Sequence, residues 1–459
     1  KSAKIVVYET LIQNTPSLGS SVANQEVANH KDKTDQGQTV IFNEPSVHTQ
    51  ATIDGTTTVN TYDKEVELKD TVTYENLAVG KEYTVKGQLI NKATQQPVKE
   101  VTAKFTPKDK SGTTDVVFKV NPKEIGAGEF VVFETVYNNK GTEIAEHKDI
   151  NDTDQTVVLK DASIGTTATI EGDKVINSKD KEVELKDTVS YKGLIPGKKY
   201  TLKGVVMDKE TGKTTEYTSS TEFTPAQEEG SADMTFKINA KDVDGKTLVV
   251  FETAYDQKGN EVANHKDLTD TGQTVEIRHP EIKTSATIDG EKSVNAKAST
   301  VELVDTVSYE GLIPGNTYTV EGKLMDKDTG KELPTDGVTV QVEDQTAQGD
   351  QGEESATEAT SKDANDIKVS STQFIPESES GTVQVKWLID LSKVKGKNIV
   401  VFETLKDKHK DEIAHHDDLS DEEQNVSVPE SKIHTKATIN GAKEVEVGKT
   451  YELVDTVDD

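Results

Sequence analysis

The stretch ELKDTVTY, residues 67–74, alternates apolar and polar side chains with a period of two. This alternation is typical of a β-strand with one face in a core and the other in solvent. The string returns as ELKDTVSY at 184–191 and as ELVDTVSY at 302–309. The segments between the copies are rich in Val, Thr, Tyr and Phe and are punctuated by Gly, Pro, Asn and Asp. The chain is therefore predicted to be all-β.

Two more strings recur in the same order and define a repeat. His-x-Asp-x-x-Asp-x-x-Gln begins at His30, His147, His265 and His416, and a threonine follows each glutamine by 11 residues. These threonines lie 117, 118 and 151 residues apart, close to the ~100 residues of an immunoglobulin-like sandwich. We therefore predict tandem immunoglobulin-like β-sandwich domains of about seven strands each, in an elongated array.

The two ends of the chain carry only parts of this repeat, so three whole modules are expected between two partial ones. The predicted domains are 1–43, the C-terminal part of an incomplete repeat; 44–160, 161–278 and 279–429, three complete domains, the last with an acidic insertion at about 331–372; and 430–459, the N-terminal part of an incomplete repeat. The insertion is expected to be a flexible loop or a protruding hairpin.

Composition excludes several classes of protein. A net charge of −30 over 459 residues disfavours binding to nucleic acid or to an anionic membrane surface. No apolar run approaches the ~18 residues of a membrane span, so no membrane insertion is expected within this segment. The absence of cysteine excludes disulfides, thiol catalysis and thiolate metal sites. No signal peptide opens the chain, so an exported protein would have to be longer.

The period of two also sorts the polar side chains that face a core. Thr49 shares a face with three apolar residues of the string VHTQATI at 47–53, and Asp70 interrupts the apolar face of 67–74. Gln155 begins the apolar face of the strand that follows it. The glutamate of each VVFET string follows a run that is apolar on both faces, which indicates burial. Each complete module thus gathers Thr, Asp, Glu, His and Gln near its core.

Two interpretations of this cluster are open from the residues alone. It could be a hydrogen-bonded network that fixes strand register. It could also be reactive, because a base can activate a threonine hydroxyl and two carboxyls forced together must share a proton. Attack of the hydroxyl on the glutamine amide would release ammonia and leave an ester, with histidine suited to the proton transfers.

The strings TxATI, ELxDTVxY, VVFET and HxDxxDxxQ[TN]V resemble the Thr–Gln ester-bond-forming immunoglobulin-like domains of Gram-positive surface adhesins, often called VaFE repeats. The resemblance covers essentially the whole chain and implies one autocatalytic ester between the first and last strands of each complete module. The implied crosslinks are Thr49–Gln155, Thr166–Gln273 and Thr284–Gln424. The implied assisting residues are Asp70, Glu134 and His147; Asp187, Glu252 and His265; and Asp305, Glu403 and His416.

The resemblance further implies the stalk of an adhesin on the extracellular, cell-wall-attached surface of a Gram-positive bacterium. It implies no cofactor, no metal and no enzymatic turnover beyond a single self-crosslinking event. The host or matrix ligand and the cell-wall anchor are expected outside this chain.

Two departures from the family pattern are visible. The third module has QNV where the others have QTV, and its insertion lengthens the path between its strands. The partial modules carry half a set each and neither can close alone: Glu9, His30 and Gln38 at one end, Thr435 and Asp455 at the other.

Three rival interpretations remain. An isopeptide bond needs an inward lysine on an early strand, but the parity of Lys283 and Lys436 points them outward. Calcium could bind the oxygens of the turn aspartates Asp149 and Asp152, in surface modules with no covalent crosslink. A substrate-turnover enzyme is disfavoured, because no Ser-His-Asp order, phosphate loop or zinc signature is present.

Overall fold

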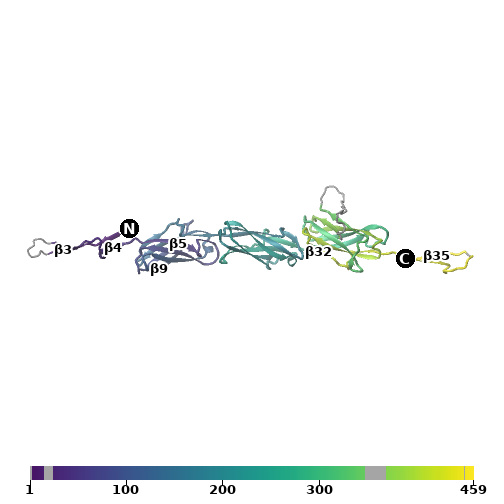
Figure 1. The fold of residues 1–459 in the computed structure, drawn as a ribbon, viewed down its shortest axis with the longest axis horizontal. Coiled ribbons are helices and arrows are strands. Elements are labelled where there is room, and N and C mark those ends of the chain that lie inside the picture. The colour runs from purple at the N-terminus through teal and green to yellow at the C-terminus, as the bar shows by residue number, and fades with distance from the viewer. Residues whose placement is uncertain (1–2, 15–23, 347–368, 449, 459) are drawn as a thin grey trace, which may run out of the picture.

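The computed structural model describes residues 3–14, 24–346, 369–448 and 450–458. Figure 1 shows three compact β bodies in a row, with a narrow strand pair extending from each end. No helix among the described residues is long and apolar enough to cross a membrane. The prediction of an all-β chain of tandem domains is confirmed.

The first body is built from two sheets. One is three-stranded and antiparallel, in the order β10-β7-β5; the other runs β6-β13-β11-β8-β9, with β12 also paired to β11. The strands of the small sheet are β5 (Ser46–Ile53), β7 (Val66–Glu75) and β10 (Gly112–Val120). Those of the large sheet are β6 (Thr58–Asn60), β8 (Tyr83–Asn91), β9 (Gln96–Phe105), β11 (Gly128–Asn138), β12 (Glu143–His147) and β13 (Thr156–Lys160). A short helix, α1 (Pro122–Ile125), precedes β11.

The second body repeats this topology strand for strand. Its small sheet holds β14 (Ser163–Ile170), β16 (Glu182–Lys192) and β19 (Glu229–Asn239). Its large sheet holds β15 (Val175–Asn177), β17 (Tyr200–Asp208), β18 (Lys213–Phe223), β20 (Thr247–Asp256), β21 (Glu261–His265) and β22 (Thr274–Arg278), with the 3₁₀ helix η2 (Ala240–Val243) before β20. The expectation of about seven strands is wrong, because each of these bodies has nine. Three-residue strands such as β6 are too short for a period-two pattern to reveal.

The third body keeps this plan and adds strands from the insertion. Its first sheet is β23 (Glu281–Ile288), β24 (Thr300–Glu310), β30 (Gly381–Asp390) and β27 (Val338–Val340). Its second holds β25 (Tyr318–Asp326), β26 (Lys331–Glu332), β28 (Val342–Asp344), β29 (Ser370–Phe374), β31 (Lys397–Lys406), β32 (Glu412–His416) and β33 (Asn425–Val428). The described part of the predicted insertion is therefore not all loop, because β27 and β28 lie within it: β27 pairs with β30, and β28 pairs in parallel with β29. Residues 347–368, where a loop or hairpin was expected, lie outside the described residues.

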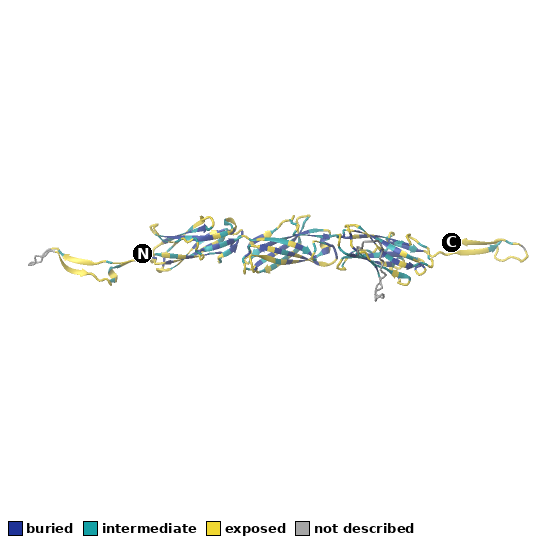
Figure 2. Cartoon of the chain, turned by 90° about the horizontal axis from the view of Figure 1, so that it is seen from above, coloured by how far each residue is buried: buried dark blue, intermediate teal, exposed yellow. Residues whose placement is uncertain are grey.

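The ends of the chain are two-stranded ribbons. At the N-terminus β1 (Ala3–Val6) pairs with β4 (Thr39–Phe42), and β2 (Glu9–Gln13) pairs with β3 (Gln25–His30), while η1 (Gln36–Gln38) leads into β4. At the C-terminus β34 (His434–Ile439) pairs with β35 (Leu453–Asp458). Figure 2 shows these ribbons almost wholly exposed, whereas the buried residues lie within the three bodies.

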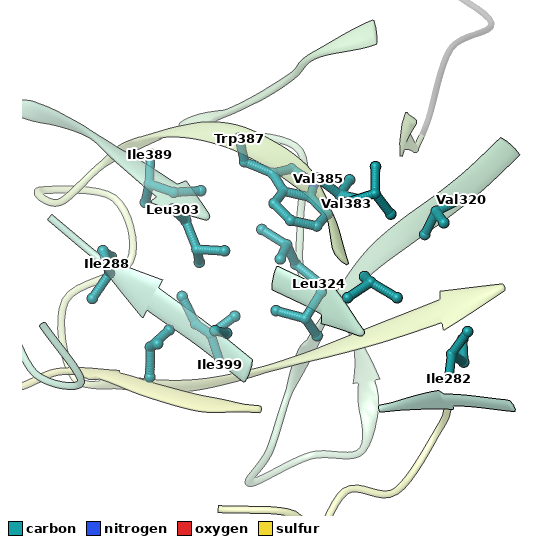
Figure 3. Close-up of a cluster of buried hydrophobic side chains, with 14 of the residues drawn as sticks. Ile282, Ile288, Leu303, Val320, Leu324, Val383, Val385, Trp387, Ile389 and Ile399 are labelled. Atoms are coloured by element: carbon teal, nitrogen blue, oxygen red, sulfur yellow. The ribbon is translucent and has the colours of Figure 1, made fainter. Parts of the chain in front are cut away.

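Each body has a core of its own between its two sheets, and the third shows how that core is filled. Trp387 of β30 is 1% exposed and packs with Leu303, Leu324 and Val385 (Figure 3). A Cβ on Gly322 would lie 2.6 Å from the Trp387 ring, so glycine is needed where the ring meets strand β25. Fully burying an aliphatic or aromatic side chain stabilises a fold by about 1.5–3 kcal/mol. Three such cores give the chain a rigid frame for buried polar groups.

Candidate functional site

The first and last strands of each body meet although they belong to different sheets. In the first body the Ala51 N–H of β5 donates to the carbonyl of Asp154, immediately before Gln155, at 2.9 Å. The corresponding bonds of the other bodies join Ala168 to Gly272 and Ala286 to Glu423, both at 2.9 Å. Because Thr49 lies two residues before Ala51, on the same face of the strand, this bond brings Thr49 beside Gln155.

In the first body the threonine, glutamine and glutamate side chains converge in the core. The Thr49 hydroxyl donates to Glu134 Oε2 at 3.1 Å, and Gln155 Nε2 donates to the same oxygen at 2.6 Å. Gln155 Nε2 also contacts Thr49 Oγ1 directly. All three side chains are buried. One carboxyl oxygen therefore lies against both the hydroxyl and the amide nitrogen.

The third body repeats the arrangement, and the second repeats most of it. Gln424 Nε2 donates to Thr284 Oγ1 and to Glu403 Oε2, each at 2.7 Å. In the second body Gln273 Nε2 donates to Glu252 Oε2 at 2.6 Å. The Thr166 hydroxyl makes no hydrogen bond with the described residues. It nevertheless keeps the register of Thr49, since Thr166 lies opposite Val189 as Thr49 lies opposite Val72.

A second carboxyl lies beside each glutamate. Asp70 of β7 is fully buried, and burial raises its pKa to about 6. Burial, and then the negative charge of Asp70, raise the pKa of Glu134 to about 11. Both Asp70 oxygens and Glu134 Oε1 are buried with no other partner, so the two carboxyls hold one proton between them near neutral pH.

The other two bodies show the same electrostatics. Burial raises the pKa of Asp187, while burial and the Asp187 charge raise that of Glu252 to about 10. Burial raises the pKa of Asp305, and burial together with Asp305 raises that of Glu403 well above its ordinary value. A protonated glutamate beside a threonine and an amide is thus a property of the repeat.

A histidine stands across from each glutamate. His147 ends β12 directly opposite Glu134 of β11, so their side chains lie on one face of the sheet. Its Nε2 pairs with Asp152 Oδ2 at 3.1 Å, and its Nδ1 is buried without a partner. The equivalent histidines lie opposite Glu252 and Glu403, with pairs His265–Asp270 at 3.1 Å and His416–Asp421 at 3.2 Å. The imidazole is therefore fixed next to the carboxyl pair.

Comparison with known families shows where the chain belongs. The family described as T-Q ester bond containing domain matches residues 1–42, 45–159, 162–277 and 280–428, most of the chain. The chain belongs to this family. Its four matched segments are consecutive copies of this domain, the first of them only 42 residues long, and the other three carry the full set of Thr, Asp, Glu, His and Gln.

Solved structures and curated proteins were also compared with the chain. Two crystal forms of a bacterial adhesin from Mobiluncus mulieris, which contains intramolecular disulfide, isopeptide and ester-bond crosslinks, match at 16% identity. Each match covers 54% of this chain and 90% of the adhesin chain, with TM-scores of 0.25 and 0.24. No curated protein matches this ester-bond chain.

The half-sets predicted at the two ends of the chain are not brought together. Glu9 pairs across from His30 at one end of the array, with both exposed, and Gln38 is only half-buried. Thr435 and Asp455 are exposed at the opposite end. Neither ribbon surrounds its polar groups with a core.

The partners of the histidines are the functional residues that sequence reasoning missed. From the sequence Asp152 is either a turn residue or a calcium ligand. One of its carboxyl oxygens does cap a turn, accepting from the Asp154 N–H at 2.8 Å, but the other pairs with His147. Asp149 likewise accepts from the Asn151 N–H. The fixed spacing of five residues between each histidine and its second aspartate was the available signal.

The structure also bears on the other rival chemistries of the ester-bond modules. Lys283 and Lys436 are exposed, as parity predicts, so neither reaches the core as an isopeptide donor. Among the described residues, His48, His147 and Asp152 place ligand atoms within 4.8 Å of one another. Since His48 is replaced by Gly165 and Lys283 in the other complete modules, that grouping is not part of the repeated site.

Proposed function

We propose that this chain is a load-bearing stalk region of a bacterial surface adhesin, closed in each complete module by a self-formed Thr–Gln ester. The proposed bonds join Thr49 to Gln155, Thr166 to Gln273 and Thr284 to Gln424. The observation that carries the proposal is the glutamine amide held against a protonated glutamate in all three modules, beside a threonine hydroxyl in two of them. We also propose that the three complete modules span residues 44–160, 161–278 and 279–429.

The reaction is a transfer of the glutamine acyl group from nitrogen to oxygen. Thr49 Oγ1 attacks Gln155 Cδ; the Oγ1–Cδ bond forms, the Cδ–Nε2 bond breaks, and nitrogen leaves as ammonia with the hydroxyl proton. Glu134 Oε2 is within hydrogen-bond distance of both the hydroxyl and the nitrogen. The Glu134 carboxyl can therefore accept the hydroxyl proton through Oε2 and return a proton to Nε2 as the Cδ–Nε2 bond breaks.

Asp70 and His147 support that exchange. The Asp70 charge helps to keep the proton on Glu134, so an acid is available at neutral pH where an isolated glutamate would be ionised. His147, oriented by Asp152, is the second group suited to move a proton at the site. All these groups are in place before reaction, so the fold supplies proximity worth about 7–11 kcal/mol of barrier.

The location of the ester gives the stalk its mechanical role. β5 is the first strand of its module and β13 the last, so an ester joining them passes tension along the chain through covalent bonds. The strands between them are then bypassed and carry little load. The buried position excludes water and protects the ester from hydrolysis. A cell-wall anchor and a host or matrix ligand are proposed to lie outside this chain.

We expect the intact folded protein to weigh less than its sequence mass by three ammonia molecules, one for each complete module. Intact-protein mass spectrometry measures this directly. Peptide mapping would place the bonds at the three Thr–Gln pairs, including that of the third module despite its insertion. Alkaline hydroxylamine added to the denatured protein should cleave the crosslinks, because it attacks esters. It also cuts the Asn440–Gly441 peptide bond, which releases only a C-terminal fragment. A folded sample at full sequence mass would contradict the proposal.

A module that cannot crosslink should lose stability as pH rises. Burial and Asp187 raise the pKa of Glu252 to about 10, whereas an unfolded glutamate titrates at about 4.3. Between these values the folded state holds the extra proton, so the free energy of unfolding falls with rising pH, by up to about 1.4 kcal/mol per pH unit. Denaturant unfolding of Thr166→Ala at pH 5 and pH 8 measures the slope. Adding Glu252→Gln should reduce the slope to what Asp187 contributes, since burial raises the pKa of Asp187 as well. A stability that rises with pH would overturn the assignment.

A further inference from the structure

A buried asparagine fills the junction between the first and second modules. The Tyr200 hydroxyl donates to Asn60 Oδ1 at 2.6 Å, and Asn60 Nδ2 donates to the carbonyls of Gly193 at 2.9 Å and Lys160 at 3.2 Å. Tyr200 also accepts from the Ile195 N–H at 3.0 Å. Asn60 is 4% exposed and Tyr200 is 1% exposed. The amide is therefore fully satisfied, and three of its contacts reach beyond its own strand.

The junction between the second and third modules has the same contacts at corresponding positions. Tyr318 donates to Asn177 Oδ1 at 2.6 Å, and Asn177 Nδ2 donates to the Gly311 carbonyl at 2.9 Å. Tyr318 again accepts from a backbone N–H, that of Ile313, at 3.0 Å. Two independent junctions with one pattern indicate a built interface, because an incidental contact has no reason to recur at equivalent residues.

The backbone at each junction is in close contact as well. Gly193 has φ of +75°, and a Cβ there would lie 2.0 Å from the Asp161 carbonyl oxygen. Gly311 has φ of +76° and the same relation to His279, at 2.1 Å. Any side chain at these positions would push the linker away from the next module.

Ion pairs surround both junctions. At the first, Lys258 pairs with Asp54 at 2.7 Å. At the second, Lys408 pairs with Asp173 at 2.6 Å, while the buried Lys179 pairs with Asp407 and Asp411 of the following module. The exposed pairs Lys258–Asp54 and Lys408–Asp173 stabilise little, about 0–1 kcal/mol each. The Lys179 pairs are buried and add a second fixed contact at the second junction.

A tyrosine and an asparagine at the equivalent positions have no complete module docked beside them, and they lack this contact. Tyr83 of the first module accepts from the Ala78 N–H at 3.0 Å, as Tyr200 and Tyr318 do with their own turns, but no asparagine reaches it among the described residues. Asn295 of the third module corresponds to Asn60 and Asn177, yet it is exposed. Where β6 and β15 form strands, the segment around Asn295 forms none, although the N–H groups of Val294 and Ala296 donate to the carbonyls of Ser427 and Pro429, both at 3.0 Å.

We propose that the Asn–Tyr contact is a docking joint whose partner is the next module of the same chain, and that it fixes the angle and rotation between successive modules. The hydroxyl and the amide recognise each other only when the asparagine strand of one module reaches the tyrosine turn of the next. Adjoining domains move relative to one another by default unless their interface holds them. This joint therefore keeps the modules in a fixed relative orientation, where a chain without it would bend freely at each linker. The joint does not depend on the ester.

The test measures the distance between two modules in the full chain. Since the protein has no cysteine, Glu124→Cys and Glu216→Cys introduce two spin labels at exposed sites on either side of the first junction. Double electron–electron resonance should give one narrow distance distribution, which Asn60→Ala broadens by about twofold or more. Asn295→Ala, the matched change at a position with no docked neighbour, should leave it unchanged.

A second pair of variants distinguishes loss of the Asn–Tyr contact from a general defect in the folding of a module. Tyr200→Phe should broaden the distribution as Asn60→Ala does, while Tyr83→Phe, which removes the same hydroxyl from the corresponding core position, should not. Intact mass reports in each sample whether the second module has folded and crosslinked. A broad distribution in the unsubstituted protein, or a narrow one in both Asn60→Ala and Tyr200→Phe, would overturn the joint.

Discussion

Thr166→Ala is expected to leave the second module without its crosslink and to lower that module's free energy of unfolding by about 4–5 kcal/mol. The figure comes from loop closure: a bond closing a loop of about 100 residues removes about that much chain entropy from the unfolded state. For a module of this size the loss corresponds to roughly 15–20 °C in melting temperature. Calorimetry of the full chain should show a new transition for one module below those of the other two.

The second module is suited to this experiment because Thr166 contributes little else. Its hydroxyl makes no hydrogen bond of normal length with the described residues, although it lies near Asp187 and Glu252 and lowers the pKa of both. The alanine therefore removes little besides the crosslink. Thr167→Ala is the matched control, since this neighbour faces outward and is exposed. The control protein should still be three ammonia molecules lighter than its sequence mass, and its thermal transitions should match those of the unsubstituted protein. If Thr166→Ala also kept both, Thr166 would not be the nucleophile.

The inward-facing members of the site were predictable because strand parity is a strong constraint. Thr49, Asp70 and Gln155 each interrupt or begin an apolar stripe, and each is buried in the structure. A polar residue on a buried face needs a partner, and the repeat showed which residue types recur together. Parity could not orient Glu134, whose strand is apolar on both faces; its carboxyl is placed by pairing with β8 and β12.

What escaped prediction depends on pairing between segments that are distant in sequence or too short to show a period. The strands β27 and β28 arise inside the expected loop because they add to sheet edges formed by β29 and β30. The role of Asp152 depends on a turn that returns its carboxylate to His147. The contact between Asn60 and Tyr200 spans two modules, so no pattern within one module contains it.

Glu252→Gln is expected to slow ester formation in the second module by about 100- to 10,000-fold, the usual contribution of a positioned acid–base group. The substituted amide preserves shape and can still hydrogen-bond Gln273, but it cannot release a proton to the departing nitrogen and recover one from the hydroxyl. Asp187→Asn should slow the reaction less, because it removes the charge that helps keep Glu252 protonated and leaves the relay itself in place. A time course of intact mass after purification measures both.

The other modules provide internal controls for these rates. The first and third should lose their ammonia on the normal timescale in either variant, so a protein two ammonia molecules lighter than its sequence mass marks the effect as local. Glu184→Gln, an exposed acid three residues before Asp187, changes the same charge without touching the site and should leave three losses. If Glu252→Gln instead lost three at the rate of the unsubstituted protein, the proton would travel by another route. His265, opposite Glu252 and held by Asp270, would then be the group to replace.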